Sequence, residues 1–282
     1  NHMTMFDALA HSLTTISTGG FSTHNNSFAF FDNNNILNIA IIFMILGSFP
    51  FLLLAQTSLT NITLLFKDNQ IRLFLIILII AIGLIYYLAR SYVDGSTFDQ
   101  LTTISFNTIS IISGTGYVSN NFETWGNYAS VLFLMLMFIG GCAGSTTGGL
   151  KIFRFQILFK YIELHLKKML EPHAVLTARF NGKKVQESTY ESVMIFFFIY
   201  IMTFASSALL LSFSGLDFLT CISAAASAIS NVGPGLGEII GPEGNYSSLT
   251  DYSKLVLTVT MFLGRLEMIT IFVLLLPSFW KN

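Results

Sequence analysis

The chain has 282 residues, of which 53% are hydrophobic and only 10% are charged. Soluble globular domains carry a charged fraction nearer a quarter, so this composition excludes an ordinary soluble domain. The formal net charge of −1 gives no reason to expect nucleic acid as a partner. Two cysteines, Cys142 and Cys221, lie in apolar surroundings and indicate neither a disulfide framework nor a zinc site.

Apolar runs long enough to cross a bilayer, about 20 residues each, recur along the chain. In order they cover residues 36–54, 71–88, 128–144, 193–213 and 255–276, and the third of them breaks into glycines. The alternative is a set of buried helices in a large soluble protein, which would leave too few charged residues to face water. We therefore predict an all-α polytopic membrane protein.

Most of the lysine and arginine residues lie on one side of these runs. They are Lys67, Arg72, Lys151, Arg154, Lys160, Lys167, Lys168, Arg179, Lys183, Lys184 and Lys281. The connections on the opposite side are mainly acidic. Because an excess of Lys and Arg near helix ends marks the cytoplasmic face, the basic side is predicted to be cytoplasmic.

Three stretches on the opposite side repeat one pattern. From Phe6, Phe98 and Leu216 they read FDALAHSLTTISTGGFS, FDQLTTISFNTISIISGTGYVS and LDFLTCISAAASAISNVGPGL. Each begins with an aspartate in the position of a helix N-cap, continues as a short helix rich in Ser, Thr and Ala, and ends in a glycine turn. The aspartates are Asp7, Asp99 and Asp217. Such a helix is too short and too polar to span, so it is predicted to enter and leave the membrane on one side.

Non-helical backbone inside a membrane persists only when it is buried in protein or lines a water-filled cavity. Three such loops around one axis would present carbonyl oxygens, which can replace the hydration shell of a cation. Gly20, Gly116 and Gly233 allow backbone angles that a Cβ would forbid. The negative C-terminal ends of the preceding helices would also favour a positive ion. The sequence therefore predicts repeated helix–re-entrant loop–helix units around a central ion pathway.

Five stretches resemble Trk-type bacterial potassium uptake proteins of the Trk/Ktr/HKT superfamily. They are STGGFSTHNNSF, SGTGYVSNNFETWG, NVGPGLGEIIGPEGNYSSL, GGCAGSTTGGLKIFRF and FLGRLEMITIFVLLLPSFW, and the resemblance runs from Phe6 to Trp280. It implies a subunit that conducts K+ across the bacterial cytoplasmic (inner) membrane, as a multi-pass protein among lipids. It also implies a homodimer with a cytosolic nucleotide-binding regulatory ring. K+ is then the transported ion, with no organic cofactor and no nucleic acid.

The same resemblance assigns residues and domains. The filter residues that it implies are Thr18, Gly19, Gly20, Gly114, Thr115, Gly116, Asn231, Val232 and Gly233. For Asn231, a turn-capping amide is the alternative. Residues 4–66 would form the pore loop and inner helix of repeat two, 67–185 repeat three with a cytoplasmic extension, and 186–282 repeat four. Because the family has four repeats and only three filter loops are visible, we expect this chain to be a fragment lacking the first repeat.

The stretch GGCAGSTTGGLK, residues 140–151, interrupts the third apolar run past mid-membrane. A phosphate-binding loop would need a Gly-Lys-Ser/Thr ending, but Gly149 is followed by Leu150. A glycine-rich helix-packing seam is a second alternative. We favour an unwound intramembrane loop beneath the filter, because the family has one there, described as a gate. The small residues that would let it fill the pore and swing aside are Gly140, Gly141, Ala143, Gly144, Ser145 and Thr146.

Arg265 falls at the centre of the last apolar run, where an isolated charge is costly and indicates function. Glu267 lies on another helix face and is not its natural partner. We expect Arg265 to face the pore and to donate to carbonyls of the loop, the alternative being a salt bridge to another buried carboxylate. No nucleophile–base pair is visible, so no enzymatic activity is predicted. The other functions left open are a less selective Na+/K+ channel, a cation-coupled symporter and, as a different class, an intramembrane enzyme or a non-conducting assembly subunit.

Overall fold

The computed structural model describes residues 3–31, 33–57, 63–173, 179–181, 183–266 and 268–281. The α-helices are α1 (Met5–Ile16), α2 (Asn34–Gly47), α3 (Phe51–Gln56), α4 (Thr63–Lys67), α5 (Asn69–Ala89), α6 (Thr97–Ile112), α7 (Asn127–Met137), α8 (Ile152–Leu170), α9 (Glu187–Ser212), α10 (Phe218–Ser230), α11 (Asp251–Arg265) and α12 (Met268–Leu275). The 3-10 helices are η1 (Ser27–Phe30), η2 (Arg90–Tyr92), η3 (Phe122–Trp125), η4 (Tyr246–Ser248) and η5 (Pro277–Lys281). Strands β1 (Arg179–Phe180) and β2 (Lys183–Lys184) pair antiparallel as a hairpin.

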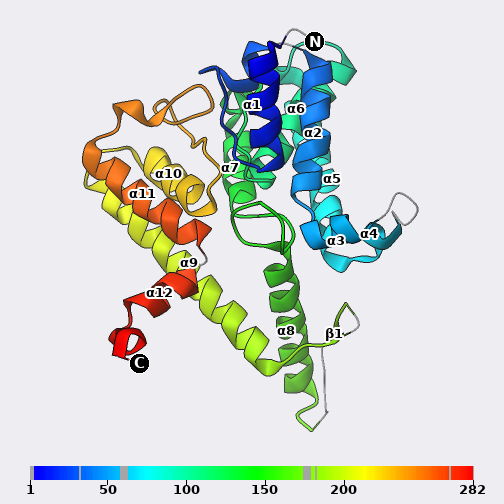
Figure 1. The fold of residues 1–282 in the computed structure, drawn as a ribbon, viewed down its shortest axis with the longest axis vertical. Helices are drawn as coiled ribbons and strands as arrows, with labels where there is room; N and C mark the ends of the chain where they lie inside the picture. The colour runs from blue at the N-terminus through cyan, green and yellow to red at the C-terminus, as the bar shows by residue number, and fades with distance from the viewer. Residues whose placement is uncertain are drawn as a thin grey trace.

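Three helical units repeat along the chain, each with a short helix, a glycine turn and an inner helix. The short and inner helices are α1 and α2, then α6 and α7, then α10 and α11. In the second and third units an outer helix precedes the short helix in the chain. The outer helix α5 packs on α6, and the outer helix α9 packs on both α10 and α11. Figure 1 shows the third unit on one side, the other two opposite it, and α8 extending away from both. The predicted fold class, an all-α polytopic membrane protein of repeated helix–re-entrant loop–helix units, is confirmed.

Two helices among the described residues are long and apolar enough to cross a membrane by themselves. They lie within Asn69–Tyr92 and Glu187–Ser212, with mean hydropathies of 2.6 and 2.2. Their exposed side chains include Ile76, Ile79 and Phe198, which suits contact with lipid tails. These helices match the predicted runs 71–88 and 193–213.

The other three apolar runs are not continuous helices, which was predicted for 128–144 and corrects the prediction for 36–54 and 255–276. In run 36–54, α2 ends at Gly47 and α3 begins only after Pro50, which has no N–H to continue a helix. In run 128–144, α7 ends at Met137. In run 255–276, α11 and α12 differ in direction by 105°. The inner helices therefore all break, whereas the outer helices α5 and α9 do not.

Side-chain caps fix where the short helices begin. Thr4 and Ser96 are the N-caps of α1 and α6, and each forms a reciprocal capping box with the aspartate three residues later. Asp7 and Asp99 are therefore third-position residues, not N-caps as predicted, whereas Asp217 is the N-cap of α10. The hydroxyl of Thr4, and then that of Thr23, lower the pKa of Asp7 to about 2. A charged aspartate here also complements the positive N-terminal end of the helix.

Candidate functional site

Three turns follow the short helices and share one backbone conformation. We call residues 18–20, 114–116 and 231–233 the filter turns, after their predicted role. In each turn the first and third residues have positive φ, a region that favours glycine. The φ angles are 49° (Thr18), 67° (Gly114) and 54° (Asn231) at the first position, and 71° (Gly20), 78° (Gly116) and 113° (Gly233) at the third. The turns therefore share positive φ angles at the same two positions although their sequences differ.

Each filter turn is anchored to a hydroxyl residue in the last turn of its short helix. The carbonyl of Thr14 accepts from Gly19 N at 2.7 Å, that of Ser110 from Thr115 N at 3.0 Å, and that of Ser227 from Val232 N at 3.0 Å. These bonds satisfy helix carbonyls that would otherwise lack a partner. The turn is thereby fixed to the C-terminal end of its helix.

The hydroxyl groups of the same three residues bind the backbone at the C-terminal end of each turn. Thr14 Oγ1 donates to the carbonyl of Phe21 at 2.9 Å, and Ser110 Oγ donates to that of Tyr117 at 2.7 Å. In the third unit, Ser227 Oγ instead accepts from Gly233 N at 3.0 Å. These anchors were not predicted from the sequence. The available signal was a hydroxyl residue four positions before the first residue of every filter turn.

The filter turns contact one another through their third glycines. A methyl group added at Gly20 would lie 1.7 Å from the carbonyl oxygen of Thr115, and one at Gly116 would lie 1.8 Å from that of Val232. The first turn thus abuts the second in the way that the second abuts the third. At Gly233 the nearest atom to such a methyl group is Gly116 Cα, at 3.9 Å. The structure therefore brings all three predicted turns together in one consistent direction.

A cavity of about 630 Å³ lies beside the filter turns. It is lined by all three turns and by residues of α11, including Lys254, Met261 and Arg265. The side chains of the third unit reach the turn itself. Tyr246 donates its hydroxyl to the carbonyl of Gly233 at 2.7 Å, and the side-chain amide of Asn231 donates to the carbonyl of Met261 at 3.2 Å. The Asn231 side chain thus holds its turn against α11.

Residues 138–151, which we call the gate loop, leave the line of α7 and return to it. Gly140 N donates to the carbonyl of Leu150 at 2.9 Å, and Leu150 N donates to that of Phe138 at 3.1 Å. The two limbs are therefore tied at their base. Figure 1 shows the loop between α7 and α8. It is unwound, as predicted, and contains every predicted small gate residue.

The gate loop packs against the inner side of the filter turns. Thr18 Oγ1 donates to Thr146 Oγ1 at 3.0 Å. A methyl group added at Gly148 would lie 2.2 Å from the carbonyl oxygen of Ser230 and 3.4 Å from Asn231 Cβ, and one at Gly114 would lie 3.5 Å from Gly148 N. The loop therefore lies close to all three turns. Larger side chains at Gly148 would not fit there.

The break between α2 and α3 supplies partners for the gate loop. The carbonyl of Ser48 accepts from Cys142 N at 2.9 Å, and that of Gly47 accepts from Thr146 Oγ1 at 3.1 Å. In return, Phe51 N donates to the carbonyl of Gly144 at 3.0 Å. The loop is held by hydrogen bonds to a helix break, which opens backbone groups that an intact helix would use internally.

Arg265 is the last residue of α11, which corrects its predicted place at the centre of a spanning helix. Its Nη1 donates to the carbonyl of Thr146 in the gate loop at 3.0 Å. The residue lines the cavity beside the filter turns and also a cavity of about 300 Å³ on the other side of the loop, with Lys151 and Arg154. Glu267 lies outside the described residues.

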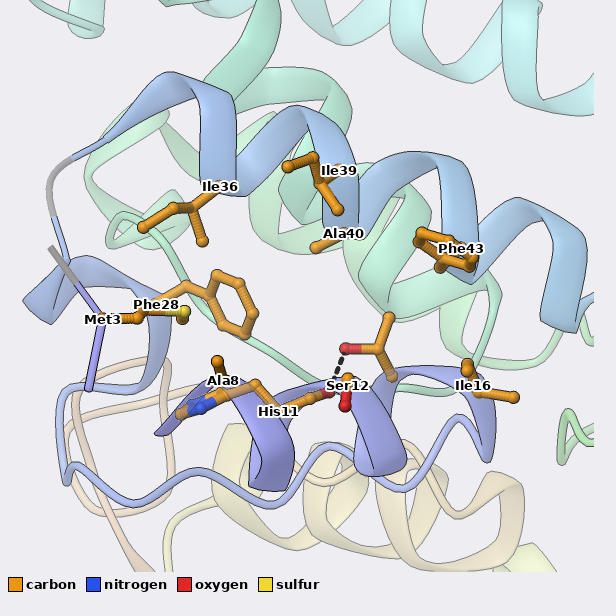
Figure 2. A pocket seen from close by; sticks show the side chains of 11 residues that line it. Met3, Ala8, His11, Ser12, Ile16, Phe28, Ile36, Ile39, Ala40 and Phe43 are labelled. Atoms are coloured by element: carbon orange, nitrogen blue, oxygen red, sulfur yellow. Dashed lines mark hydrogen bonds between the residues drawn. The ribbon is translucent and has the colours of Figure 1, made fainter. Parts of the chain in front are cut away.

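A third cavity, of about 340 Å³, lies between α1 and α2 of the first unit and is lined mainly by apolar side chains. Figure 2 shows Ile36, Ile39 and Phe43 of α2 facing α1 across it, with His11 and Phe28 at its side. His11 is buried, and its ring nitrogens contact the Asp7 carbonyl at 2.7 Å and Ser22 Oγ at 2.9 Å. The histidine therefore holds the segment after the first filter turn. No group of three His, Cys, Asp or Glu side chains suited to a metal occurs within the described part of the chain.

Comparisons with known proteins agree with this architecture. The family model described as TrkH, cation transport protein, matches residues 1–281. The Trk system potassium uptake protein TrkI of Halomonas elongata is 39% identical over 282 residues, and the match covers 99% of this chain and 57% of that protein. The Trk system potassium uptake protein TrkH of Vibrio parahaemolyticus is 35% identical over 284 residues, covering 99% of this chain and 58% of the relative.

The crystal structure of the potassium transporter TrkH from Vibrio parahaemolyticus superposes with a TM-score of 0.91 at 35% identity. The match covers 99% of this chain and 60% of that one, so the chain spans less than two thirds of the length of these relatives. The sequence match over almost the whole chain and the shared arrangement of helices lead to one conclusion. The chain belongs to the TrkH family of cation transport proteins.

Proposed function

We propose that this chain is the larger part of a potassium-translocating membrane subunit, which conducts K+ through the filter turns under control of the gate loop. The contact between the three turns supports this proposal most directly. Three backbone segments of one conformation touch in sequence, so their carbonyl groups can surround a single ion. The relatives that match along almost all of this chain are named potassium uptake proteins.

In this mechanism K+ sheds water as it enters the turns, and backbone carbonyls replace its hydration shell. The C-terminal ends of α1, α6 and α10 lie at the turns, and their partial negative charge stabilises a cation there. The glycines at the third positions allow the turns to approach closely enough for their carbonyls to share one ion. Because the three turns differ in sequence, the filter is less uniform than one built from four identical strands. A less selective Na+/K+ pathway is therefore the second candidate.

The gate loop closes the path on the inner side of the turns. Thr146 contacts Thr18 of the first turn, and its carbonyl accepts from Arg265. The Arg265 guanidinium adds a fixed positive charge next to the cation path, which opposes cation entry while the loop is in place. Release of this contact would remove the plug and the barrier together.

The domain division follows the three units. We propose that residues 4–66 belong to repeat two, 67–185 to repeat three and 186–282 to repeat four. The relatives are longer than this chain, and the open side of Gly233 is where a fourth turn would continue the contacts seen at Gly20 and Gly116. In the third unit, the short helix α10 and the inner helix α11 both contact the outer helix α9. The corresponding helices of the first unit, α1 and α2, have an apolar cavity between them. An outer helix of repeat two would cover it.

We propose the bacterial inner membrane as the location, with several spans and the basic residues of α8 on the cytoplasmic face. A homodimer and a cytosolic nucleotide-binding regulator are the proposed partners. The names of the relatives refer to a Trk system, and α8 ends in Lys167 and Lys168, which suits a cytoplasmic surface. We propose transport and no enzymatic activity.

Radiolabelled rubidium uptake into liposomes tests this function, using the full-length protein that contains this chain. We expect uptake that potassium competes with and that exceeds uptake by empty liposomes. The Ile76→Ala variant, altered on the lipid-facing side of α5, should take up rubidium as well as the wild type does. Correctly inserted protein with no uptake above empty liposomes would leave a non-conducting assembly subunit as the function.

A further inference from the structure

The gate loop has a side-chain contact with the outer helix α5. Gln70, in the first turn of α5, accepts a hydrogen bond at its Oε1 from Ala143 N at 2.8 Å. The Gln70 side chain is 9% exposed, and it does not line the cavity on either side of the loop. The N–H of Ala143 is partly buried, and a backbone N–H shielded from water is costly to leave without an acceptor, so this bond favours the observed position of the loop.

The first turn of α5 is in turn tied to the hairpin on the cytoplasmic side. Asp68 caps α5, because its Oδ1 accepts from Gln70 N at 2.8 Å and from Ile71 N at 3.2 Å. Its other oxygen, Oδ2, accepts from Asn181 Nδ2 at 2.9 Å, in the turn between β1 and β2. One carboxylate thus joins the hairpin to the backbone N–H of the residue that holds the gate loop.

A second bond joins the same turn of α5 to the helix that follows the gate loop. Gln156 of α8 donates through Nε2 to the carbonyl of Asn69 at 2.8 Å. The gate loop, α8 and the hairpin therefore meet within residues 68–70. A shift of the hairpin would displace the cap of α5 before it reaches any residue of the filter turns.

We propose that Gln70 is a positioning residue that latches the gate loop in its closed place, and that the β1–β2 hairpin acts on this latch through Asn181 and Asp68. This proposal rests on the proposed function in one respect only, which is that the loop acts as a gate. The other hydrogen bonds of the loop described above come from Thr18, from residues 47–51 at the break of α2 and from Arg265. Because Gln70 lines neither cavity, it can change the position of the loop without changing the lining of the path.

Cys142 provides a direct measurement of loop position. Its side chain is fully buried and adjoins Ala143 in the chain. We would label the full-length protein in liposomes with a thiol reagent, in a background in which every other cysteine, including Cys221, is replaced by serine. The rate of Cys142 labelling then reports how often the loop leaves its place, independently of ion flux.

Gln70→Met removes the acceptor at similar side-chain length and should raise the labelling rate about fivefold, the effect of one net hydrogen bond. Gln70→Glu keeps an acceptor oxygen and should restore a rate close to that of the wild type. Asn181→Ala should raise the rate by a smaller factor, about twofold, because it acts through Asp68. Combined with Gln70→Met it should add nothing, since both act on one latch. The matched control is Gln100→Met, because Gln100 of α6 bonds to the carbonyl of Val93, away from the loop.

Unchanged Cys142 labelling in Gln70→Met, or an equal rise in Gln70→Glu, would overturn the proposal. If Gln70→Met fails to insert, Asn181→Ala decides, because its exposed position on the hairpin cannot disturb the core, and an unchanged rate there would overturn the coupling. Rubidium uptake is measured on the same samples. Faster labelling with unchanged uptake would leave the latch standing and would refute the gate in the proposed function.

Discussion

The three filter turns and the three inner-helix breaks beneath them differ in how closely they repeat. The turns share one pattern of φ angles and one kind of contact with each other. The breaks do not match: α2 resumes after three residues as α3, α7 gives way to the gate loop, and α11 ends at Arg265. Selecting an ion requires similar carbonyl-lined segments around it, whereas blocking the path requires only one segment that moves. We therefore propose that the layer of filter turns, which repeats, selects the ion, and that the layer of helix breaks, which does not repeat, gates it.

The largest effect is expected from a substitution that breaks the contact between filter turns. Gly116→Ala would put a methyl group 1.8 Å from the carbonyl oxygen of Val232, so one turn must move away from the next. We expect potassium-competed rubidium uptake to fall about a hundredfold, because a filter with displaced carbonyls no longer offsets dehydration. Ile76→Ala, on the exposed side of α5, is the control. Normal uptake by Gly116→Ala would show that these turns do not form the filter.

Gly233→Ala tests whether the repeated layer continues beyond this chain. Within the described residues its methyl group would meet nothing closer than 3.9 Å, although a φ of 113° disfavours any side chain. If a fourth turn abuts Gly233 in the full-length protein, uptake should fall as far as in Gly116→Ala. A loss about tenfold smaller, from backbone strain alone, would mean that no carbonyl lies there.

Sequence reasoning found the turns because they recur three times, and it found the gate loop because a glycine run interrupts an apolar segment. It placed Asp7 and Asp99 wrongly, since Thr4 and Ser96, three residues earlier, compete for the N-cap. It also treated 36–54 as one span, although Pro50 cannot continue a helix. The first error came from aligning these aspartates with Asp217, which is an N-cap, and the second came from giving hydropathy more weight than the proline.

Other features depend on contacts between distant segments and leave no local pattern. Gln70 is a single polar residue at the start of an apolar run, and its partner, Ala143, belongs to another segment of the chain. The close approach of Gly148 to the carbonyl of Ser230 likewise requires the folded arrangement. The sequence suggested which residues matter at the site, but not how the loop is held.

Changes in the gate loop should alter rubidium uptake in the opposite direction to changes in the filter turns. Deleting two residues between Gly144 and Gly148, or replacing Arg265 with Ala, should raise rubidium uptake about five- to tenfold, because each weakens the contact of Arg265 with the carbonyl of Thr146. The double variant should not exceed the larger single effect, since both changes act on one element. Uptake is compared in the wild type, both single variants and the double.

Two results would contradict the gate. The first is loss of uptake in a deletion variant that inserts correctly, and the second is simple additivity of the two changes. In either case the glycines of the loop would be explained by helix packing.

The smallest effect is expected at the capping aspartate of the first unit. The hydroxyls of Thr4 and Thr23 lower the pKa of Asp7 to about 2, below the value of about 3.9 in an unfolded chain. The stabilisation is therefore complete above pH 4 and is lost as the pH falls toward 2. Asp7→Asn should lower the melting temperature of the detergent-solubilised protein at pH 5 slightly, and by less at pH 3. An equal difference at both pH values would show that the carboxylate charge plays no part.

The claim that the filter turns select the ion and the gate loop controls its flow is tested most directly by the potassium-to-sodium permeability ratio. This ratio is measured for Gly116→Ser and Arg265→Ala in liposomes containing the full-length protein. Gly116→Ser should lower the ratio, because its added side chain displaces the carbonyl of Val232. Arg265→Ala should raise total flux and leave the ratio unchanged. A ratio that falls equally in both variants, or that falls only in Arg265→Ala, would contradict the claim that the repeated turns select and the gate loop controls flow.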